Sequence, residues 1–381
     1  MRIIFDARWI FEKPSGIGVY STELIRRLSS ILPEVHFIVL FSSKEIAERT
    51  LPTLPQNIEC CIVKHKPTSI KSQLFMPRII KKLKADIYFS PNYLIPYFAF
   101  TGPFKSKTKC VTTIHDIIPL IVTDYAPDSK TSRMLKLYKY CIGLTVKLSK
   151  HILVDSNSTK CDIIEQVKPS DTDAKKINTV YIGVPERTAK PIMHEAVIND
   201  LTDTKRVRQL LYVGRLDPYK NVPLLIEAAN EAKKQLPFPI KVVIAGPEDE
   251  RYPEARDVAA QSFYIHTEFT GFISDEALCK LYADSDVLVH PSIYEGFGLP
   301  VVEAMRIGLP VICTDGGSLP EVAGEACRVV PTSNLEALTE AIVETLSYPE
   351  ACTEMSKRGI EQAMKFNWEK AAQETKDYLL A

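Results

Sequence analysis

Two glutamates, Glu295 and Glu303, lie in the run HPSIYEGFGLPVVEAM, after an apolar strand that ends at His290. A helix is expected to begin near Leu299–Pro300, because proline suits the first helical turn. The glycines before it leave backbone N–H groups uncovered, and such a nest attracts phosphate or sugar oxygens. Two carboxylates there can accept hydrogen bonds from paired hydroxyls of a sugar or ribose. The alternative is that Glu295 caps the helix and Glu303 lies on a solvated face.

Two cations follow a second strand, in the run YVGRLDPYKNVPLLIEA. Arg215 and Lys220 flank a turn between Gly214 and a helix that begins near Asn221. Arginine offers a planar fork and lysine a mobile charge, so the pair suits a diphosphate. Together they would stabilise the charge on a leaving diphosphate, as a magnesium ion does elsewhere. An ordinary surface pair near an aspartate is the alternative.

His115 ends a third apolar strand and is followed by Asp116. A histidine in this place can contact substrate hydroxyls or a reacting centre, and we expect Asp116 to orient it or to cap the next element. Gly16 and Gly18 precede a helix whose N-terminus can face an anion. A structural histidine and a tight glycine turn are the alternatives.

Strands and helices that alternate along the whole chain would position these residues, and they predict βα units with parallel sheets. Ligands bind beyond the carboxyl ends of such strands, where the residues above lie. In the first half, strands are expected at Arg2–Ala7, His36–Phe41, Ile58–Val63, Asp86–Phe89, Cys110–Ile114, Ile152–Asp155 and Thr179–Ile182. In the second half, they are expected at Gln209–Val213, Lys241–Ala245, Phe263–Phe269, Val287–His290, Val311–Thr314 and Arg328–Val330. Clear helical patterns cover Ile17–Ser29, Thr131–Ser149 and Trp368–Leu380.

The length of 381 residues predicts two α/β domains. The periodicity breaks over residues 184–206, so we divide the chain into 1–190, 191–365 and a last helix at 366–381. The nine cysteines include no C-x-x-C and are expected to be reduced. The sequence shows neither a membrane-spanning run nor a signal peptide, so a cytoplasmic location is expected.

Charge is divided unequally between the halves. Residues 1–190 carry 29 Lys and Arg against 17 Asp and Glu, whereas residues 191–381 carry 18 against 30. Nucleic acid is not expected as the partner of the basic half, because aromatic residues are not interleaved with the basic ones. An anionic lipid surface or a phosphate-bearing acceptor fits better. Mutual attraction of the two domains is the alternative.

Five motifs, spread over nearly the whole chain, resemble those of family 4 glycosyltransferases with the GT-B fold. They are the Gly16–Gly18 loop, His115–Asp116, the run G-R-x-x-x-x-K from Gly214 to Lys220, the E-x7-E motif of Glu295 and Glu303, and the run D-G-G-S-L-P-E from Asp315 to Glu321. The resemblance implies two Rossmann-like domains with parallel sheets facing a central cleft. The first domain would bind the acceptor and the second the nucleotide sugar, with the last helix crossing back to the first.

The resemblance also implies a role for each residue. Glu303 would bind the ribose, Glu295 the hydroxyls of the transferred sugar, and His115 the sugar near its anomeric carbon. Arg215 and Lys220 would neutralise the diphosphate, with retention of the anomeric configuration and without a metal ion or other cofactor. The remaining donor contacts would come from Gly16, Gly18, Gly246, Phe272, Ile273, Gly296, Phe297, Gly298 and Leu299.

The runs D-A-R-W, S-G-I-G-V-Y and H-D-I-I-P-L look like those of bacterial mannosyltransferases of O-antigen or exopolysaccharide assembly that use GDP-mannose. UDP-glucose, UDP-N-acetylglucosamine and GDP-fucose stay open as donors. The acceptor would be a saccharide, free or linked to polyprenyl diphosphate at the inner face of the cytoplasmic membrane. A basic segment with apolar neighbours, from Lys71 to Lys84, would rest on that surface.

Three other classes of protein compete with this interpretation. A nucleotide-sugar-binding protein without catalysis is disfavoured by the full set of cations and carboxylates. A nicotinamide-dependent oxidoreductase would need a G-x-G-x-x-G run after a strand, and the sequence has none. A two-domain sugar-nucleotide epimerase would convert the donor alone.

Overall fold

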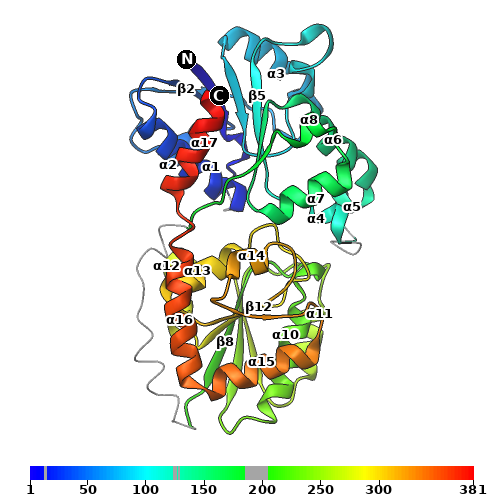
Figure 1. Cartoon of the computed structure of the whole chain (residues 1–381), viewed down its shortest axis with the longest axis vertical. Coiled ribbons are helices and arrows are strands. Elements are labelled where there is room, and N and C mark those ends of the chain that lie inside the picture. Colours follow the sequence, from blue (N-terminus) through cyan, green and yellow to red (C-terminus); the bar gives the residue numbers. More distant parts are fainter. Residues whose placement is uncertain (13–14, 123–126, 128, 185–204) are drawn as a thin grey trace. The chain divides into compact units, whose positions relative to one another are not determined.

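The computed structural model describes residues 1–12, 15–122, 127, 129–184 and 205–381. They form two compact units (Figure 1). Unit 1 comprises Met1–Ile117, Met134–Gly183 and Asn367–Ala381, and unit 2 comprises Ile118–Arg133 and Val184–Phe366. The boundary expected between residues 190 and 191 lies outside the described residues.

Unit 1 is built on a seven-stranded sheet in the order β3-β2-β1-β4-β5-β6-β7, with every pairing parallel. Its strands are β1 (Arg2–Asp6), β2 (His36–Phe41), β3 (Ile58–Ile62), β4 (Ile87–Ser90), β5 (Lys109–Ile114), β6 (His151–Val154) and β7 (Ile177–Thr179). Its helices are α1 (Gly16–Ile31), α2 (Lys44–Thr50), α3 (Ile70–Leu83), α6 (Leu135–Leu148), α7 (Asn157–Val167), α8 (Asp171–Ala174) and α17 (Trp368–Leu380), with the 3-10 turns η1 (Ala7–Trp9), η2 (Tyr97–Ala99) and η3 (Gly102–Phe104).

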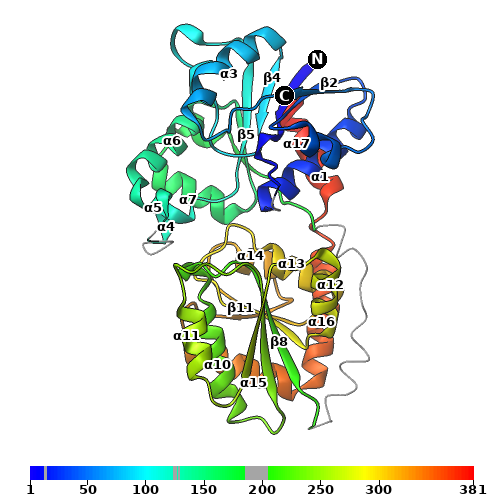
Figure 2. The ribbon, with the colours of Figure 1, turned by 180° about the vertical axis from the view of Figure 1, so that it is seen from behind.

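The last helix, α17, packs beside the first, α1 (Figures 1 and 2). The Trp368 ring meets Tyr20 edge-on at 5.9 Å between centroids. Gly183 permits this packing, because a Cβ atom there would lie 2.4 Å from the backbone nitrogen of Trp368. An ion pair of 3.0 Å joins Arg27 to Glu369 at the start of α17. The last helix therefore forms part of unit 1.

Unit 2 has a six-stranded sheet in the order β10-β9-β8-β11-β12-β13, again with every pairing parallel. Its strands are β8 (Arg208–Val213), β9 (Ile240–Ala245), β10 (His266–Gly271), β11 (Val287–His290), β12 (Val311–Thr314) and β13 (Arg328–Val330). Its helices are α4 (Ile118–Ile121), α5 (Lys130–Arg133), α10 (Val222–Lys233), α11 (Glu254–Gln261), α12 (Asp275–Asp284), α13 (Leu299–Ile307), α14 (Leu319–Ala323), α15 (Leu335–Ser347) and α16 (Pro349–Ala363), with the 3-10 turn η5 (Pro218–Lys220).

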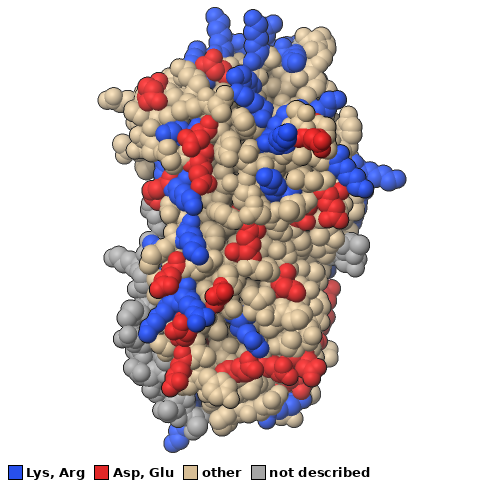
Figure 3. All heavy atoms as spheres, viewed as in Figure 1, with Lys and Arg blue, Asp and Glu red and all other residues tan. Residues whose placement is uncertain are grey.

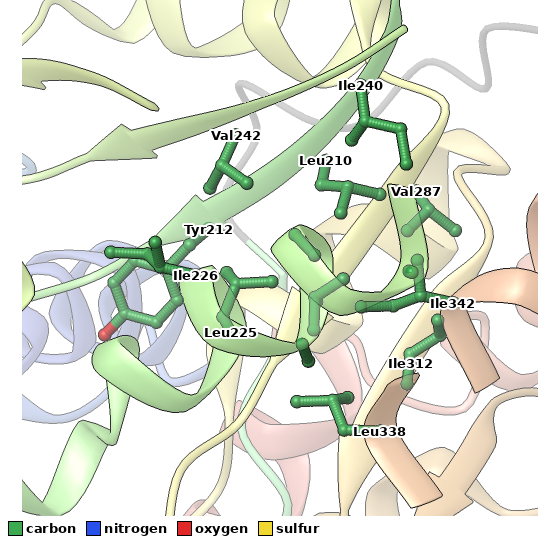
Figure 4. Packing of buried hydrophobic residues seen from close by; sticks show 14 of the residues in the cluster. Leu210, Tyr212, Leu225, Ile226, Ile240, Val242, Val287, Ile312, Leu338 and Ile342 are labelled. Atoms are coloured by element: carbon green, nitrogen blue, oxygen red, sulfur yellow. The ribbon is translucent and has the colours of Figure 1, made fainter. Parts of the chain in front are cut away.

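Helices cover both faces of this sheet, with α10, α11 and α15 on one side and α12, α13 and α16 on the other (Figures 1 and 2). Figure 4 shows the core under α10 and α15. Leu210 and Tyr212 point to the same face because they are two residues apart on β8. They are fully buried with Leu225 of α10 and Ile342 of α15. Burial of each such side chain contributes about 1.5–3 kcal/mol to the stability of the fold. This core holds in place the strands whose ends carry the loops of the site.

The predicted α/β class with parallel sheets is confirmed, and β2, β11, β12 and β13 have the predicted bounds. Three predictions were wrong. The strand expected at Phe263–Phe269 is His266–Gly271. The strand expected at Thr179–Ile182 is Ile177–Thr179. The helix expected over Thr131–Ser149 is two helices, because Met134 leaves the helical conformation, with φ −126° and ψ 31°.

All nine cysteines are unbridged, as expected. Within the described residues, every helix is too short or too polar to cross a membrane.

Candidate active site

The Glu295 carboxylate is the centre of the site in unit 2. It lies in the loop between β11 and α13, and its Oε1 atom accepts hydrogen bonds from three side chains. Lys220 Nζ lies 2.6 Å away, and His290 Nε2 and Ser292 Oγ each lie 2.7 Å away. The structure thus joins residues from two predicted clusters, since Lys220 comes from the turn after β8.

These donors determine the charge of Glu295. Burial alone would raise its pKa, but the Lys220 ammonium ion and the His290 hydrogen bond outweigh burial, so the pKa lies well below the ordinary 4.5. The carboxylate is therefore ionised at neutral pH and holds Lys220 in place. In such an ion pair the carboxylate can accept a hydrogen bond from a hydroxyl, and the ammonium group can bind a phosphate.

The N-terminus of α13 follows directly. Gly298 is its N-cap residue, with φ +90°, and as a glycine it has no side chain that could cap the helix. A Cβ atom at Gly298 would lie 2.7 Å from Leu319, so both the backbone conformation and the packing require glycine. The Phe297 side chain is buried against Phe366, at 5.4 Å between ring centroids. Since Glu295 does not cap the helix, the first alternative from the sequence is excluded.

Glu303 lies one turn into α13 and is 2% exposed. Its Oε2 atom accepts a hydrogen bond of 2.8 Å from the Tyr282 hydroxyl of α12. A buried carboxylate of this kind is not part of a solvated face, so the second alternative is excluded too. The structure places Glu303 on the same helix as the uncapped N-terminus, within the same short segment as Glu295.

The run from Asp315 to Glu321 supports Glu295 from the other side. Gly317 forms an isolated parallel bridge with Glu295, and the Ser318 amide donates to the Glu295 carbonyl at 3.0 Å. A Cβ atom at Gly317 would lie 2.3 Å from that carbonyl oxygen. This motif therefore fixes the backbone of the loop that carries the carboxylate.

Arg215 takes a different partner from Lys220. Its Nε atom lies 2.9 Å from Asp217 Oδ2, and its side chain is 64% exposed. The Tyr212 hydroxyl donates to the Arg215 carbonyl at 2.6 Å and holds the backbone in place. The two predicted cations thus lie on one turn, each beside a carboxylate of its own.

Three residues implied among the remaining donor contacts, Gly246, Phe272 and Ile273, lie at the carboxyl ends of neighbouring strands. Gly246 directly follows β9, and its amide donates to the carbonyl of Gly271, the last residue of β10, at 3.1 Å. Phe272 comes next and is 68% exposed, whereas Ile273 is half-buried. An exposed aromatic ring at this edge is suited to stack on a flat ring.

In unit 1, His115 follows β5 and is held at both ring nitrogens. Its Nδ1 atom lies 2.6 Å from Asp155 Oδ2, and its Nε2 atom lies 3.0 Å from the Pro91 carbonyl oxygen. Since both partners are acceptors, the arrangement favours the doubly protonated ring. Burial would lower the pKa of His115, but the Asp155 carboxylate and the Pro91 carbonyl outweigh it and raise the pKa above the ordinary 6.5. We expected Asp116 to orient the ring, and Asp155 has that place.

The Gly16–Gly18 loop opens α1, as predicted, with Gly16 as its first residue. Ser15 is the N-cap residue, and its hydroxyl accepts from the Gly18 amide at 3.1 Å. Among the residues that the structure describes, no atom beyond the neighbours of Gly16 along the chain lies within 4 Å of a Cβ built there. One of the first amides of α1 is thus occupied by a side chain, in contrast to α13.

Sequence reasoning missed four partners of the predicted residues, namely Asp155, Tyr282, His290 and Ser292. The signal for His290 and Ser292 was present, because both stand in the same run as Glu295 and carry donor side chains. Asp155 directly follows β6, which pairs with β5, so it lies beside His115 at the sheet edge. Tyr282 lies on another helix, α12, and its proximity to Glu303 could not be predicted without knowing that α12 packs on α13.

Comparison with known proteins agrees with this geometry. The family model described as Glycosyltransferase Family 4 matches residues 14–187, and that of Glycosyl transferases group 1 matches residues 195–362. The O-antigen chain mannosyltransferase B of Escherichia coli is 27% identical over 399 aligned positions, which cover 98% of each protein.

Two solved structures share the fold. Sucrose-phosphate synthase from Thermosynechococcus elongatus aligns with a TM-score of 0.72 at 20% identity, over 99% of this chain and 98% of its own. The Anabaena protein HepE, in complex with UDP-glucose, gives 0.72 at 17% identity over 100% and 99%. The fold of the two units is thus that of GT-B glycosyltransferases, as the sequence predicted. Because the two family models together account for nearly the whole chain, the protein belongs to the family 4 glycosyltransferases.

Proposed function

We propose that this protein is a retaining transferase that moves mannose from GDP-mannose to a saccharide, or to a lipid-linked saccharide, in surface polysaccharide synthesis. The observation that carries the proposal is the ion pair between half-buried Lys220 and buried Glu295, which lies beside the glycine-capped N-terminus of α13. Mannose and the pathway are supported by the full-length likeness to a protein named an O-antigen mannosyltransferase.

Each group of the donor has a matching group in unit 2. The diphosphate would lie against Lys220, Arg215 and the backbone amides that lead into α13, where cations and N–H groups favour negative charge. Glu295 would accept hydrogen bonds from hydroxyls of the mannose, and Glu303 from those of the ribose. The guanine would lie beside Gly246, Phe272 and Ile273.

The chemistry needs no covalent help from the protein. The bond between the anomeric carbon and the diphosphate oxygen breaks, and its electron pair leaves with GDP. The acceptor oxygen bonds to the same face of that carbon, and the acceptor proton passes to the leaving diphosphate. Lys220 and Arg215 would stabilise the charge on the diphosphate, which is the role that a metal ion has in other transferases.

His115 would contact the transferred mannose near its anomeric carbon. In that role its Nε2–H group exchanges the Pro91 carbonyl for a sugar oxygen, while Asp155 keeps the ring oriented. A protonated ring would also favour the negative charge of the donor.

Donor identity can be tested by thermal unfolding with GDP-mannose, GDP-fucose, UDP-glucose, UDP-N-acetylglucosamine and GDP. A nucleotide at 100 times its Kd stabilises the folded state by about 2.7 kcal/mol. We expect the largest rise in Tm with GDP-mannose and GDP. Stabilisation by uridine nucleotides alone would replace GDP-mannose by a UDP-sugar, which is the rival donor class.

Catalysis is tested with Lys220→Ala, whose folding is checked by circular dichroism. We expect GDP release from GDP-mannose, with or without transfer, to be abolished. An exposed lysine elsewhere in unit 2, Lys234→Ala, is the matched control. A protein that binds the donor but releases no GDP in its wild-type form would be a non-catalytic binding protein. The anomeric signal of the product in a proton NMR spectrum tests retention, and assay in excess EDTA tests metal independence.

The outer face of α3 would bring the protein to an anionic membrane that presents the acceptor. Ile70, Leu74 and Phe75 are exposed there among Lys71 and Arg78. Ile80, which the sequence also suggested for this face, is buried in the core of unit 1. Retention on vesicles with phosphatidylglycerol that is no greater than on neutral vesicles at low salt would contradict this part of the proposal.

A further inference from the structure

A lysine-lined cavity is present in unit 1, away from the strand ends that carry His115. A cavity of about 660 Å³ opens where β4 and β5 begin, between the end of α3 and the end of α17. Six lysines line it, namely Lys81, Lys84, Lys105, Lys107, Lys109 and Lys150. Figure 3 shows lysine and arginine side chains gathered at the end of unit 1 where the two termini lie.

These positive charges are not neutralised by neighbouring side chains. None of the six lysines forms an ion pair with a residue that the structure describes. The acidic side chain in the lining is Asp86, whose Oδ2 atom accepts from the Arg2 amide at 2.8 Å. Surface lysines usually have acidic neighbours, so this excess is unusual.

The lysines also affect one another. The Lys109 ammonium group, as a donor and as a like charge, lowers the pKa of Lys150 together with burial. The next residue, His151, responds in the same way: burial and the charges of Lys150, Lys109 and Lys176 lower its pKa. Its Nε2 atom is buried without a hydrogen-bond partner. The positive potential therefore extends inward to the beginning of β6.

The cavity is of a size that suits a small ligand rather than a single ion. Ile80, Ile87 and Leu379 contribute an apolar part to its lining, beside the ammonium groups. Lysine is a point charge that binds phosphate readily. Several ammonium groups from three separate segments match an anion that carries several phosphates.

We propose that this lysine pocket is a binding site for an anion with clustered phosphates, separate from the donor site in unit 2. The two sites differ in place, since the donor site lies at the carboxyl ends of strands and the lysine pocket at their amino ends. A free polyphosphate and the headgroups of a phospholipid share this chemistry, and the experiment separates them.

The experiment measures binding of inorganic tripolyphosphate by calorimetry at low salt, and of vesicles by sedimentation. One set of vesicles contains phosphatidylglycerol and phosphatidylcholine, and the other contains phosphatidylcholine only. The pocket variant carries Lys109→Gln and Lys150→Gln. The control variant carries Lys136→Gln and Lys139→Gln on the exposed side of α6, with the same change of charge.

We expect wild-type protein to bind tripolyphosphate, with at least a tenfold loss of affinity in the pocket variant and less than a twofold loss in the control. The same pattern with anionic vesicles and not with tripolyphosphate supports the site and assigns its phosphates to lipid. Equal losses in the two variants, or no binding of either probe by wild type, overturn the proposal. If the pocket variant does not fold, Lys81→Gln with Lys105→Gln replaces it, since both side chains are exposed. Donor binding in unit 2 is measured separately with GDP, so failure of one site does not count against the other.

Discussion

His115 of unit 1 and His290 of unit 2 occupy similar places in their sheets. Each lies at the carboxyl end of a parallel strand, and each ring nitrogen that faces a carboxylate is within 2.7 Å of it. Their surroundings differ. Among the residues that the structure describes, the His115 ring is the side-chain donor to Asp155, whose Oδ1 atom is buried without a partner. Glu295 instead receives three donors, including the Lys220 ammonium group.

The histidine and the carboxylate therefore have different roles in the two units. In unit 1 the carboxylate acts on the histidine, because the ring has acceptors on both sides and its pKa is raised. In unit 2 the histidine acts on the carboxylate, as one of several donors that keep it ionised. The first pair holds a positive charge at the strand end, and the second holds a negative charge and a lysine. Four substitutions or conditions test this distinction.

The largest effect is expected from Glu295→Gln. The change removes the acceptor for sugar hydroxyls and the charge that anchors Lys220, so the rate of transfer should fall by about 100-fold or more. The measurement is the kcat and KM for GDP release. Glu231→Gln, at an exposed ion pair on α10, serves as the control. A rate within threefold of wild type would show that this carboxylate has only a structural use.

Asp155→Asn is expected to have the next largest effect. It leaves the half-buried His115 ring without its charged acceptor, and a hydrogen bond to a charged group contributes about 1.5–3 kcal/mol. Urea denaturation should show a loss of this size in the free energy of unfolding, and Glu165→Gln on the exposed side of α7 should show almost none. An unchanged midpoint would mean that the pair does not hold a charged ring.

The pH dependence of stability distinguishes the pairs further. The folded pKa of His115 is raised above 6.5, so its contribution is fully present below about pH 6.5 and is lost as the pH rises through the raised pKa. The difference in unfolding free energy between wild type and His115→Gln should therefore shrink as the pH rises above 6.5, by at most about 1.4 kcal/mol per pH unit. A difference that grows with pH would have the wrong sign and would exclude a charged ring.

The sequence predicted the central residues of the two sites, but not the side chains to which they bind. Glu295, Lys220 and His115 stand at strand ends, and alternation of strands and helices is enough to place such residues at one edge of a sheet. The strand order is not contained in that alternation. The sequence does not reveal that β5 pairs with β6. Asp116 was therefore expected as the partner of His115, because it is the next residue along the chain.

The fold shows the same limit. Strands that are apolar throughout, such as Val287–His290 and Val311–Thr314, were predicted to the residue because their ends are marked by polar or turn residues. The interruption at Met134 has no glycine or proline to announce it, and helix-forming residues stand on both sides. The segments before and after Met134 belong to different units, and a local pattern does not contain that division.

The smallest effect is expected from Ser292→Ala, and it tests whether the donors to Glu295 act together. Lys220 and His290 remain within 2.7 Å of the carboxylate after this change, so the negative charge stays compensated. The loss should be about 1 kcal/mol in unfolding free energy, which is typical of one hydrogen bond, with the transfer rate reduced less than tenfold. Asp155, by contrast, depends on the His115 ring as its side-chain donor within the described residues. If Ser292→Ala destabilises the protein as much as Asp155→Asn, the three donors form one inseparable unit, and the contrast between a shared and an unshared carboxylate does not hold.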